Sequence, residues 1–72
     1  MIKMVVCLNI REAVKILKEH GVKISEAMLR AGLEQKVYPF GEAVTIVKHT
    51  EYNVYKKLLL DWIAEREVTE NV

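Results

Sequence analysis

The 72-residue chain contains little cysteine, proline or glycine: one Cys, one Pro and three Gly. A single cysteine excludes a disulfide within the chain and a cysteine-rich zinc site. Cys7 is therefore expected to be a small buried residue of a cytoplasmic protein. No apolar run approaches the roughly 20 residues of a membrane span, and residues 1–10 lack the cleavage site of a signal peptide. These absences predict no membrane contact.

The composition that remains is typical of a globular protein. Hydrophobic residues make up 51% of the chain and charged residues 29%, which is too apolar for a disordered segment. A chain of this length forms one domain, which we assign to residues 1–67, with residues 68–72 as a frayed acidic tail. So small a core leaves little room for a catalytic cleft. We therefore expect a binding protein rather than an enzyme, with no metal or other cofactor.

Charge is divided unevenly along the chain, although the net charge is only +1. Residues 1–60 hold ten Lys or Arg against six Glu, a net charge of +4. Residues 61–72 hold one Arg against one Asp and three Glu, a net charge of −3. A mildly basic body with an acidic tail favours a weak phosphate binder that works as one of several copies.

The first helix is predicted over residues 10–20. Asn9 and Glu12 have the spacing of a capping box, in which each side chain accepts a backbone hydrogen bond from the other residue. Gly21 supplies the left-handed residue that commonly ends a helix. Apolar residues recur on one helical face at Ile10, Ala13, Val14 and Leu17. Ahead of this helix, residues 1–8 are apolar enough to dock as a short extended stretch.

A second helix is predicted over residues 26–35, with Ser25 as its N-cap. Its buried side would contain Met28, Leu29 and Leu33. Gly32 lies inside the pattern and indicates the close approach of another helix, because glycine otherwise costs about 1 kcal/mol relative to alanine. Two helices joined by so short a turn cross steeply, which is the helix-turn-helix arrangement.

The rest of the chain predicts a hairpin and a third helix. Pro-Phe-Gly at residues 39–41 indicates a tight turn. Residues 43–47 and 52–55 are β-prone, and the polar residues 48–51 have the length of a hairpin loop. The third helix covers residues 56–67, with an apolar face formed by Tyr55, Leu58, Leu59, Trp62 and Ile63. Helix, helix, two-stranded hairpin wing and helix predict the α+β class and a winged helix-turn-helix.

Four stretches of the chain also share a pattern with a known family. They are Arg11-Glu12-Ala13-Val14-Lys15-Ile16-Leu17, then Ile24-Ser25 with Leu29, Arg30, Gly32 and Leu33, then Pro39-Phe40-Gly41-Glu42-Ala43-Val44, and finally Val54-Tyr55-Lys56-Lys57 with Trp62. In that order they resemble a first helix, a turn with its recognition helix, the connection found in a phage subset, and the strand and closing helix after the wing. Over about residues 8–64 the chain resembles the small winged-helix proteins of the excisionase and MerR-like group of bacteriophages and mobile elements.

The resemblance implies that the protein binds double-stranded DNA, with its second helix in the major groove and its wing beside a minor groove or along the backbone. It implies an excisionase-like factor that directs recombination, or a small transcriptional regulator. An integrase or another recombinase would be its protein partner, and copies would associate cooperatively on DNA. The chain departs from the family on the second helix, where one of five exposed positions is basic: Glu26, Ala27, Arg30, Ala31 and Glu34.

Arg30 is the principal candidate for a base contact, because a guanidinium can donate two hydrogen bonds to guanine O6 and N7. The alternative is an ion pair with Glu26 or Glu34 on the same helix. Ala27 is small enough to leave room for a groove. Ser25 can cap the helix and also contact a phosphate at the helix N-terminus.

The remaining candidates flank the second helix or lie on the wing. Arg11 and Lys23 are placed as phosphate clamps on either side of the turn. Lys48, His49 and Thr50 at the wing tip could reach phosphates or a minor groove, and the alternative is a solvated loop. The competing function is a protein–protein interaction module that kept the winged fold without DNA binding. The weakly basic second helix and the acidic tail favour that alternative.

Overall fold

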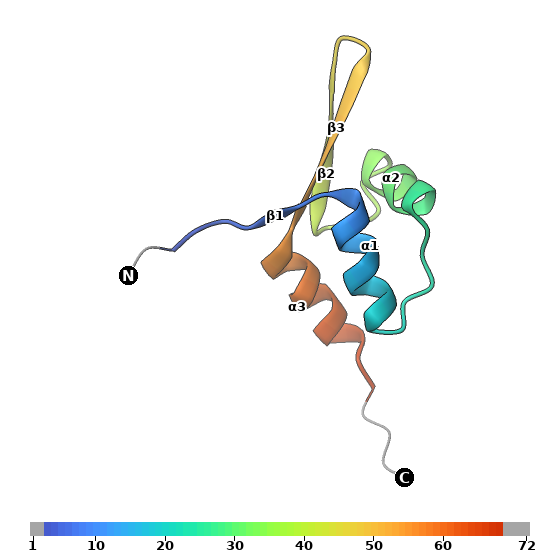
Figure 1. Cartoon of the computed structure of the whole chain (residues 1–72), viewed down its shortest axis with the longest axis vertical. Coiled ribbons are helices and arrows are strands. Elements are labelled where there is room, and N and C mark those ends of the chain that lie inside the picture. Colours follow the sequence, from blue (N-terminus) through green and yellow to red (C-terminus); the bar gives the residue numbers. More distant parts are fainter. Residues whose placement is uncertain (1–2, 69–72) are drawn as a thin grey trace.

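The computed structural model describes residues 3–68, which form three helices and a three-stranded antiparallel sheet (Figure 1). The elements follow the order β1 (Cys7–Leu8), α1 (Ile10–Glu19), α2 (Glu26–Glu34), β2 (Gly41–Ile46), β3 (His49–Tyr55) and α3 (Lys56–Arg66). The predicted α+β class is confirmed. The sheet also gains β1, a strand that the sequence predicted only as an extended stretch. Of the predicted frayed tail, residues 69–72 lie outside the described residues.

Helix α1 begins and ends as its caps predict. The Asn9 side chain accepts a hydrogen bond from the Glu12 N–H at 2.8 Å, and the Glu12 carboxylate accepts one from the Asn9 N–H at 3.2 Å. Gly21 takes the left-handed conformation, with φ +86°, and the Val22 N–H donates to the Leu17 carbonyl at 2.9 Å. Because these bonds satisfy both ends, the helix presents its apolar face to the core, and its four predicted members are buried: Ile10, Ala13, Val14 and Leu17.

Helix α2 starts at the predicted N-cap, where the Ser25 hydroxyl accepts a hydrogen bond from the Met28 N–H at 3.1 Å. Leu29 and Leu33 are buried, but the prediction that Met28 shares their face is wrong, because Met28 is exposed. Leu29 and Leu33 stand one turn apart, whereas Met28 is rotated by about 100° from Leu29. Lys36 follows the helix with φ +58°, the left-handed conformation that glycine adopts most readily.

Gly32 makes room for an aromatic ring rather than for another helix, which corrects the prediction. A Cβ at Gly32 would overlap the ring of Tyr38. Tyr38 stacks on Phe40 with their ring centroids 5.2 Å apart. Phe40 and Trp62 pack edge to face, also with ring centroids 5.2 Å apart. Phe40 is fully buried. The aromatic cluster of Tyr38, Phe40 and Trp62 therefore packs the segment after α2 against α3.

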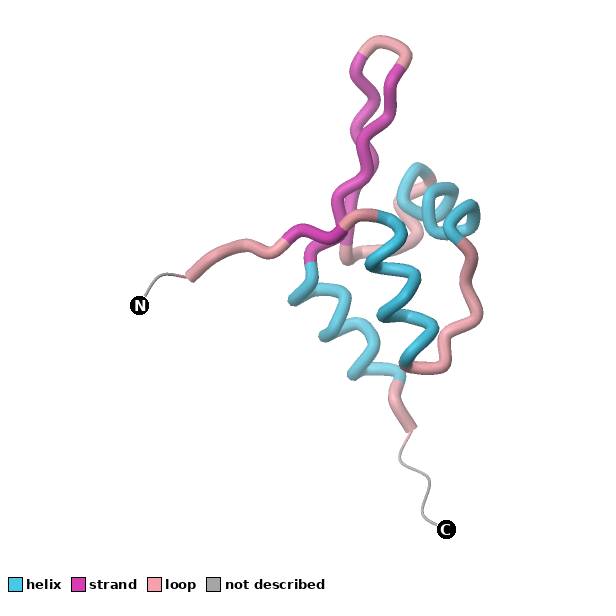
Figure 2. Tube along the Cα trace, in the orientation of Figure 1, coloured by secondary structure: helices cyan, strands magenta, loops and turns pink. Residues whose placement is uncertain are grey.

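The sheet has the strand order β1-β3-β2, and its β2–β3 hairpin projects from the helical body (Figure 2). The predicted four-residue loop at 48–51 is wrong: Val47 and Lys48 alone form the turn, between the paired residues Ile46 and His49. His49 and Thr50 are therefore strand residues. Strand pairing overrides their polar character, because a hairpin satisfies backbone N–H and C=O groups up to the tightest available turn.

The core lies between the helices and the inner face of the sheet. Its largest fully buried side chains are Phe40, Leu17, Leu29, Leu59 and Val54. Cys7 is exposed, which corrects the prediction of a buried residue: alternation along β1 turns Leu8 inward and Cys7 outward. Leu58 is exposed as well, so it does not belong to the buried face of α3. In the described part of the chain, no helix has the length and hydropathy that crossing a membrane requires.

Candidate nucleic-acid interface

A shallow groove between α1 and α2 contains a group of three cations near the predicted site. Arg11, Lys15 and Lys18 recur at the i, i+4 and i+7 positions of α1 and are all exposed. Glu19 of α1 also lines the groove, and the opposite wall includes Glu26, the first residue of α2. Residues on one helical face at this spacing form a continuous stripe. Arg11 is thus part of a basic surface with Lys15 and Lys18, two residues that were not among the predicted site residues.

Glu26 connects this groove to the main candidate for base recognition. The Arg30 guanidinium donates to the Glu26 carboxylate at 3.2 Å, one turn away on α2. Both side chains are nearly half exposed, at 44% and 45%. An ion pair in solvent contributes only about 0–1 kcal/mol. Arg30 is therefore held near the groove by an interaction that a phosphate or a guanine could replace.

The start of α2 carries the other candidates that the sequence singled out. Ser25 is the N-cap, Ala27 is exposed in the first turn, and Lys23 is exposed in the connection from α1. The Ser25 hydroxyl accepts its capping bond as an oxygen acceptor, which leaves its own O–H free to donate to an anion. These three residues are close neighbours along the chain of Glu26, which lines the groove.

The far end of α2 is tied to the hairpin by one side-chain hydrogen bond. The Tyr52 phenol of β3 donates to the Glu34 carboxylate at 2.9 Å. This bond to a carboxylate raises the pKa of Tyr52 above 10.0. Glu34 is consequently engaged with the sheet, whereas Glu26 is the carboxylate that pairs with Arg30.

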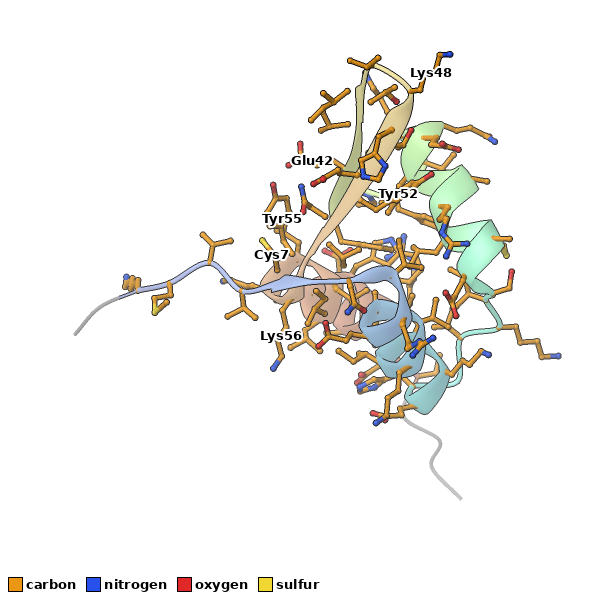
Figure 3. The ribbon with its side chains drawn as sticks, turned by 45° about the horizontal axis from the view of Figure 1, so that its top comes forward. Cys7, Glu42, Lys48, Tyr52, Tyr55 and Lys56 are labelled. Atoms are coloured by element: carbon orange, nitrogen blue, oxygen red, sulfur yellow. The ribbon has the colours of Figure 1, made fainter. Side chains whose placement is uncertain are left out.

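The structure separates the three predicted wing residues instead of grouping them in one loop. Lys48 stands at the far end of the hairpin (Figure 3). Thr50 shares a sheet face with Tyr52, because residues two apart in a strand point the same way, and its hydroxyl lies 3.0 Å from that of Thr45. His49 belongs to the opposite face, where its Nε2 lies 3.6 Å from the Glu51 carboxylate.

Lys15 and Lys18 are the residues that sequence reasoning missed. Their signal was present as a four-residue and then a three-residue spacing after Arg11, on the exposed side of a helix whose other face is apolar. The predicted base contact lies on the second helix, where Arg30 is the single basic residue between Glu26 and Glu34. Cations of the first helix can still serve a site on the second, because tertiary packing sets the two helices side by side.

These elements define a small α+β domain with a basic groove across two helices and a projecting hairpin. Comparison of the chain with protein-family models, curated proteins and solved structures gives no significant match. The candidate interface is therefore supported by its geometry and its charge.

Proposed function

We propose that the chain is a winged helix-turn-helix protein that binds double-stranded DNA and performs no catalysis. The observation that carries the proposal is the shared groove of α1 and α2: three cations of α1 line it together with Glu19 and Glu26, and Glu26 holds Arg30. Duplex DNA presents one phosphate charge about every 1.7 Å of its axis, so the cationic stripe along α1, with Arg30 on α2, can contact it electrostatically. The proposed biological role is that of an excisionase-like recombination factor or a small transcriptional regulator.

In this proposal α2 enters the major groove with its N-terminal half foremost. Arg30 reads a guanine, while Ser25 and Lys23 contact phosphates at the helix start. Arg11, Lys15 and Lys18 of α1 follow the adjoining backbone, as the first helix of such a motif does. The hairpin extends the contact, with Lys48 at its tip directed toward backbone or minor groove.

The proposed partners follow from the same role. An integrase or another recombinase would act on the DNA that the protein occupies, and several copies would bind repeated sites cooperatively in the cytoplasm. The formal charge of +1 favours tandem binding, because one copy supplies few net contacts to phosphates.

A salt titration of DNA binding tests the proposal. We expect log affinity to fall linearly with log salt concentration, with a slope of about −4.5 if the five cations assigned to the backbone neutralise phosphates. Lys15→Ala should weaken binding to all sequences alike and reduce the magnitude of the slope by about one. Lys57→Ala, which removes an exposed cation from α3, is the matched control and should change neither. Fluorescence anisotropy with a labelled duplex measures both quantities.

The second candidate function is a protein–protein interaction module without DNA binding. It is favoured by the two carboxylates of α2, since Glu26 pairs with Arg30 and Glu34 accepts from Tyr52. The pair with Glu26 partly neutralises Arg30, and the Glu34 carboxylate adds negative charge to α2. The titration separates the two candidates: if the folded protein binds neither specific nor random duplex at low salt, the interaction module is the better assignment.

A further inference from the structure

The edge of the sheet at β1 carries an exposed apolar strand segment. β1 has β3 as its only strand neighbour in the described sheet, and the segment before it extends away from the body (Figure 1). Met4, Val5 and Val6 are 80%, 75% and 52% exposed. Edge strands of monomeric proteins are usually protected by charge, proline or a bulge. Residues 4–8 contain neither a charge nor a proline.

The backbone of this segment is arranged to accept another strand. The Val6 carbonyl accepts a hydrogen bond from the Lys56 N–H at 2.9 Å, so Val6 directs its backbone groups toward the body. In an extended strand successive residues alternate in direction. The N–H and C=O groups of Val5 and Cys7 therefore point toward the open edge, two residues apart, where an antiparallel strand can exchange hydrogen bonds with both.

An apolar groove lies beside the same edge. It has a volume of about 590 Å³. It is lined by residues 4–6, by Tyr55 at the end of β3, and by Leu58 and Leu60 of α3, with Lys56, Lys57 and Asp61 also among its lining residues. Leu58 and Leu60 are 46% and 39% exposed. Strand edge and groove thus form one surface that offers backbone hydrogen bonds along one side and apolar side chains along the other.

We propose that a second copy of this chain occupies this surface, by antiparallel pairing of residues 4–8 of the two copies across a twofold axis at Val6. In this register Val5 of each copy exchanges hydrogen bonds with Cys7 of the other, which are the residues whose backbone groups point outward. The two three-stranded sheets become one six-stranded sheet. A twofold interface requires a self-complementary surface, and a strand edge paired with its own copy provides one.

Charge also favours a second copy in this register. Lys3 of one copy lies opposite Asn9 of the other, and the Asn9 N–H donates to the Glu12 carboxylate at 3.2 Å. Lys3 therefore approaches an anionic group at the start of α1. The axis at Val6 thus sets a cation against a carboxylate twice, once at each end of the paired strands.

The area available predicts a weak dimer. The exposed fractions of Met4, Val5, Val6, Leu58 and Leu60 add up to about three whole side chains. At on the order of 100 Å² for each, burying them removes roughly 600 Å² over both copies. Stable interfaces bury about 1,200–2,000 Å², and smaller ones are transient. The dimer is therefore expected at high protein concentration, or where DNA holds copies close together. It requires no DNA and stands apart from the proposed function.

Sedimentation velocity without DNA tests the proposal. From about 10 μM to about 1 mM, we expect the wild-type protein to shift from monomer to dimer. Val5→Pro removes one N–H of the open edge in each copy and should raise the dimer dissociation constant at least about tenfold. Val68→Pro is the matched control: Val68 is also an exposed valine, and Glu67 before it already has the extended backbone that proline requires. It should dimerise like the wild type.

The single cysteine provides a second measurement. Any covalent dimer made through Cys7 joins two chains, because the chain has one cysteine. In the proposed register the two Cys7 residues are displaced by about 7 Å along the strands, too far for a direct disulfide but within reach of a short bismaleimide. Val5→Pro should suppress this cross-linking while a monofunctional maleimide still labels Cys7. Met4→Glu, which keeps every backbone group, should also suppress it.

Three outcomes would overturn the proposal. The wild type could remain monomeric at every concentration, which would mean that residues 4–6 are not covered by a second copy. It could dimerise while Val5→Pro and Met4→Glu dimerise equally well, which would place the interface elsewhere. Finally, Val5→Pro and Met4→Glu could both cross-link through Cys7 with the same yield as the wild type, which would mean that Cys7 is not beside this interface. Circular dichroism melting curves check that each variant is folded. If Val5→Pro does not fold, the dimerisation and cross-linking of Met4→Glu test the proposal.

Discussion

The phenol of Tyr52 on β3 donates a 2.9 Å hydrogen bond to the Glu34 carboxylate in the last residue of α2. The two residues are 18 positions apart, and their bond joins the hairpin to the helix proposed to enter DNA. A second phenol, that of Tyr55, donates to the Glu42 carboxylate across the hairpin. Both bonds raise the pKa of the tyrosine that donates.

The first prediction concerns stability at high pH. Tyr52 and Tyr55 have folded-state pKa values above the ordinary 10.0, so their contribution is fully present below about pH 10. As the pH rises further, the unfolded state loses its protons first, and the contribution disappears through the folded-state pKa values. The melting temperature should therefore fall more steeply above pH 10 for the wild type than for Tyr52→Phe with Tyr55→Phe. Glu34→Gln should lower the pKa of Tyr52 toward 10.0 in a tyrosinate absorbance titration. Equal slopes for wild type and double variant would contradict this assignment.

The second prediction concerns Gly32. Helix propensity alone says that Gly32→Ala stabilises α2 by about 1 kcal/mol. The Tyr38 ring occupies the space of the new Cβ, and it cannot move without leaving Phe40 and Trp62. We therefore expect a loss of about 1–3 kcal/mol in the free energy of unfolding, measured by urea denaturation. A gain in the free energy of unfolding would contradict this prediction, because it would mean that Tyr38 moves away at little cost.

The third prediction concerns the hairpin turn. Val47 has φ +58° and is 91% exposed, so a β-branched residue occupies a left-handed position where glycine is preferred. Val47→Gly should raise the free energy of unfolding by about 0.5–1 kcal/mol. Lys48→Gly is the control, because Lys48 does not have a positive φ. It should give no gain. A loss at both positions would show that the turn carries no strain at Val47.

The fourth prediction concerns Arg30 and rests on the proposed function. If Arg30 reads a guanine, Arg30→Ala should remove about 1–3 kcal/mol of discrimination between the cognate site and random DNA. Glu26→Gln should instead strengthen binding, because it releases Arg30 from the 3.2 Å pair and removes a negative charge. Anisotropy with single and tandem sites measures both effects. If Arg30→Ala loses the same affinity for cognate and for random DNA, Arg30 contacts a phosphate and not a base.

Local interactions made the helices predictable. Asn9 with Glu12, Ser25 and Gly21 act within one turn of the chain, so the sequence alone was enough to predict where α1 and α2 begin and where α1 ends. The apolar face of α1 was equally clear because four residues at helical spacing have no competing interpretation. The hairpin was predicted in position but not in turn length, since the polar residues His49, Thr50 and Glu51 pair with Ile46, Thr45 and Val44.

The candidate site was predicted less completely than the helices. Arg30 and Arg11 were predicted as isolated candidates. The spacing of Arg11, Lys15 and Lys18 was present in the sequence, but only the tertiary structure places Glu26 of α2 across the groove from them. Lys48, His49 and Thr50 were predicted as one tip, and strand alternation sends two of them to opposite faces. Their contacts with DNA remain predictions.

The sequence by itself determined the α+β class, the caps and the buried face of α1, because those features depend on neighbours within about four residues. Tertiary structure alone decided that Tyr38 fills the space over Gly32, that Cys7 and Met28 face solvent, and that β1 forms an edge with residues 4–6 exposed. Each of these depends on which distant segment packs beside the residue. Helical periodicity and residue preference are local quantities, and they carry no information about that distant neighbour.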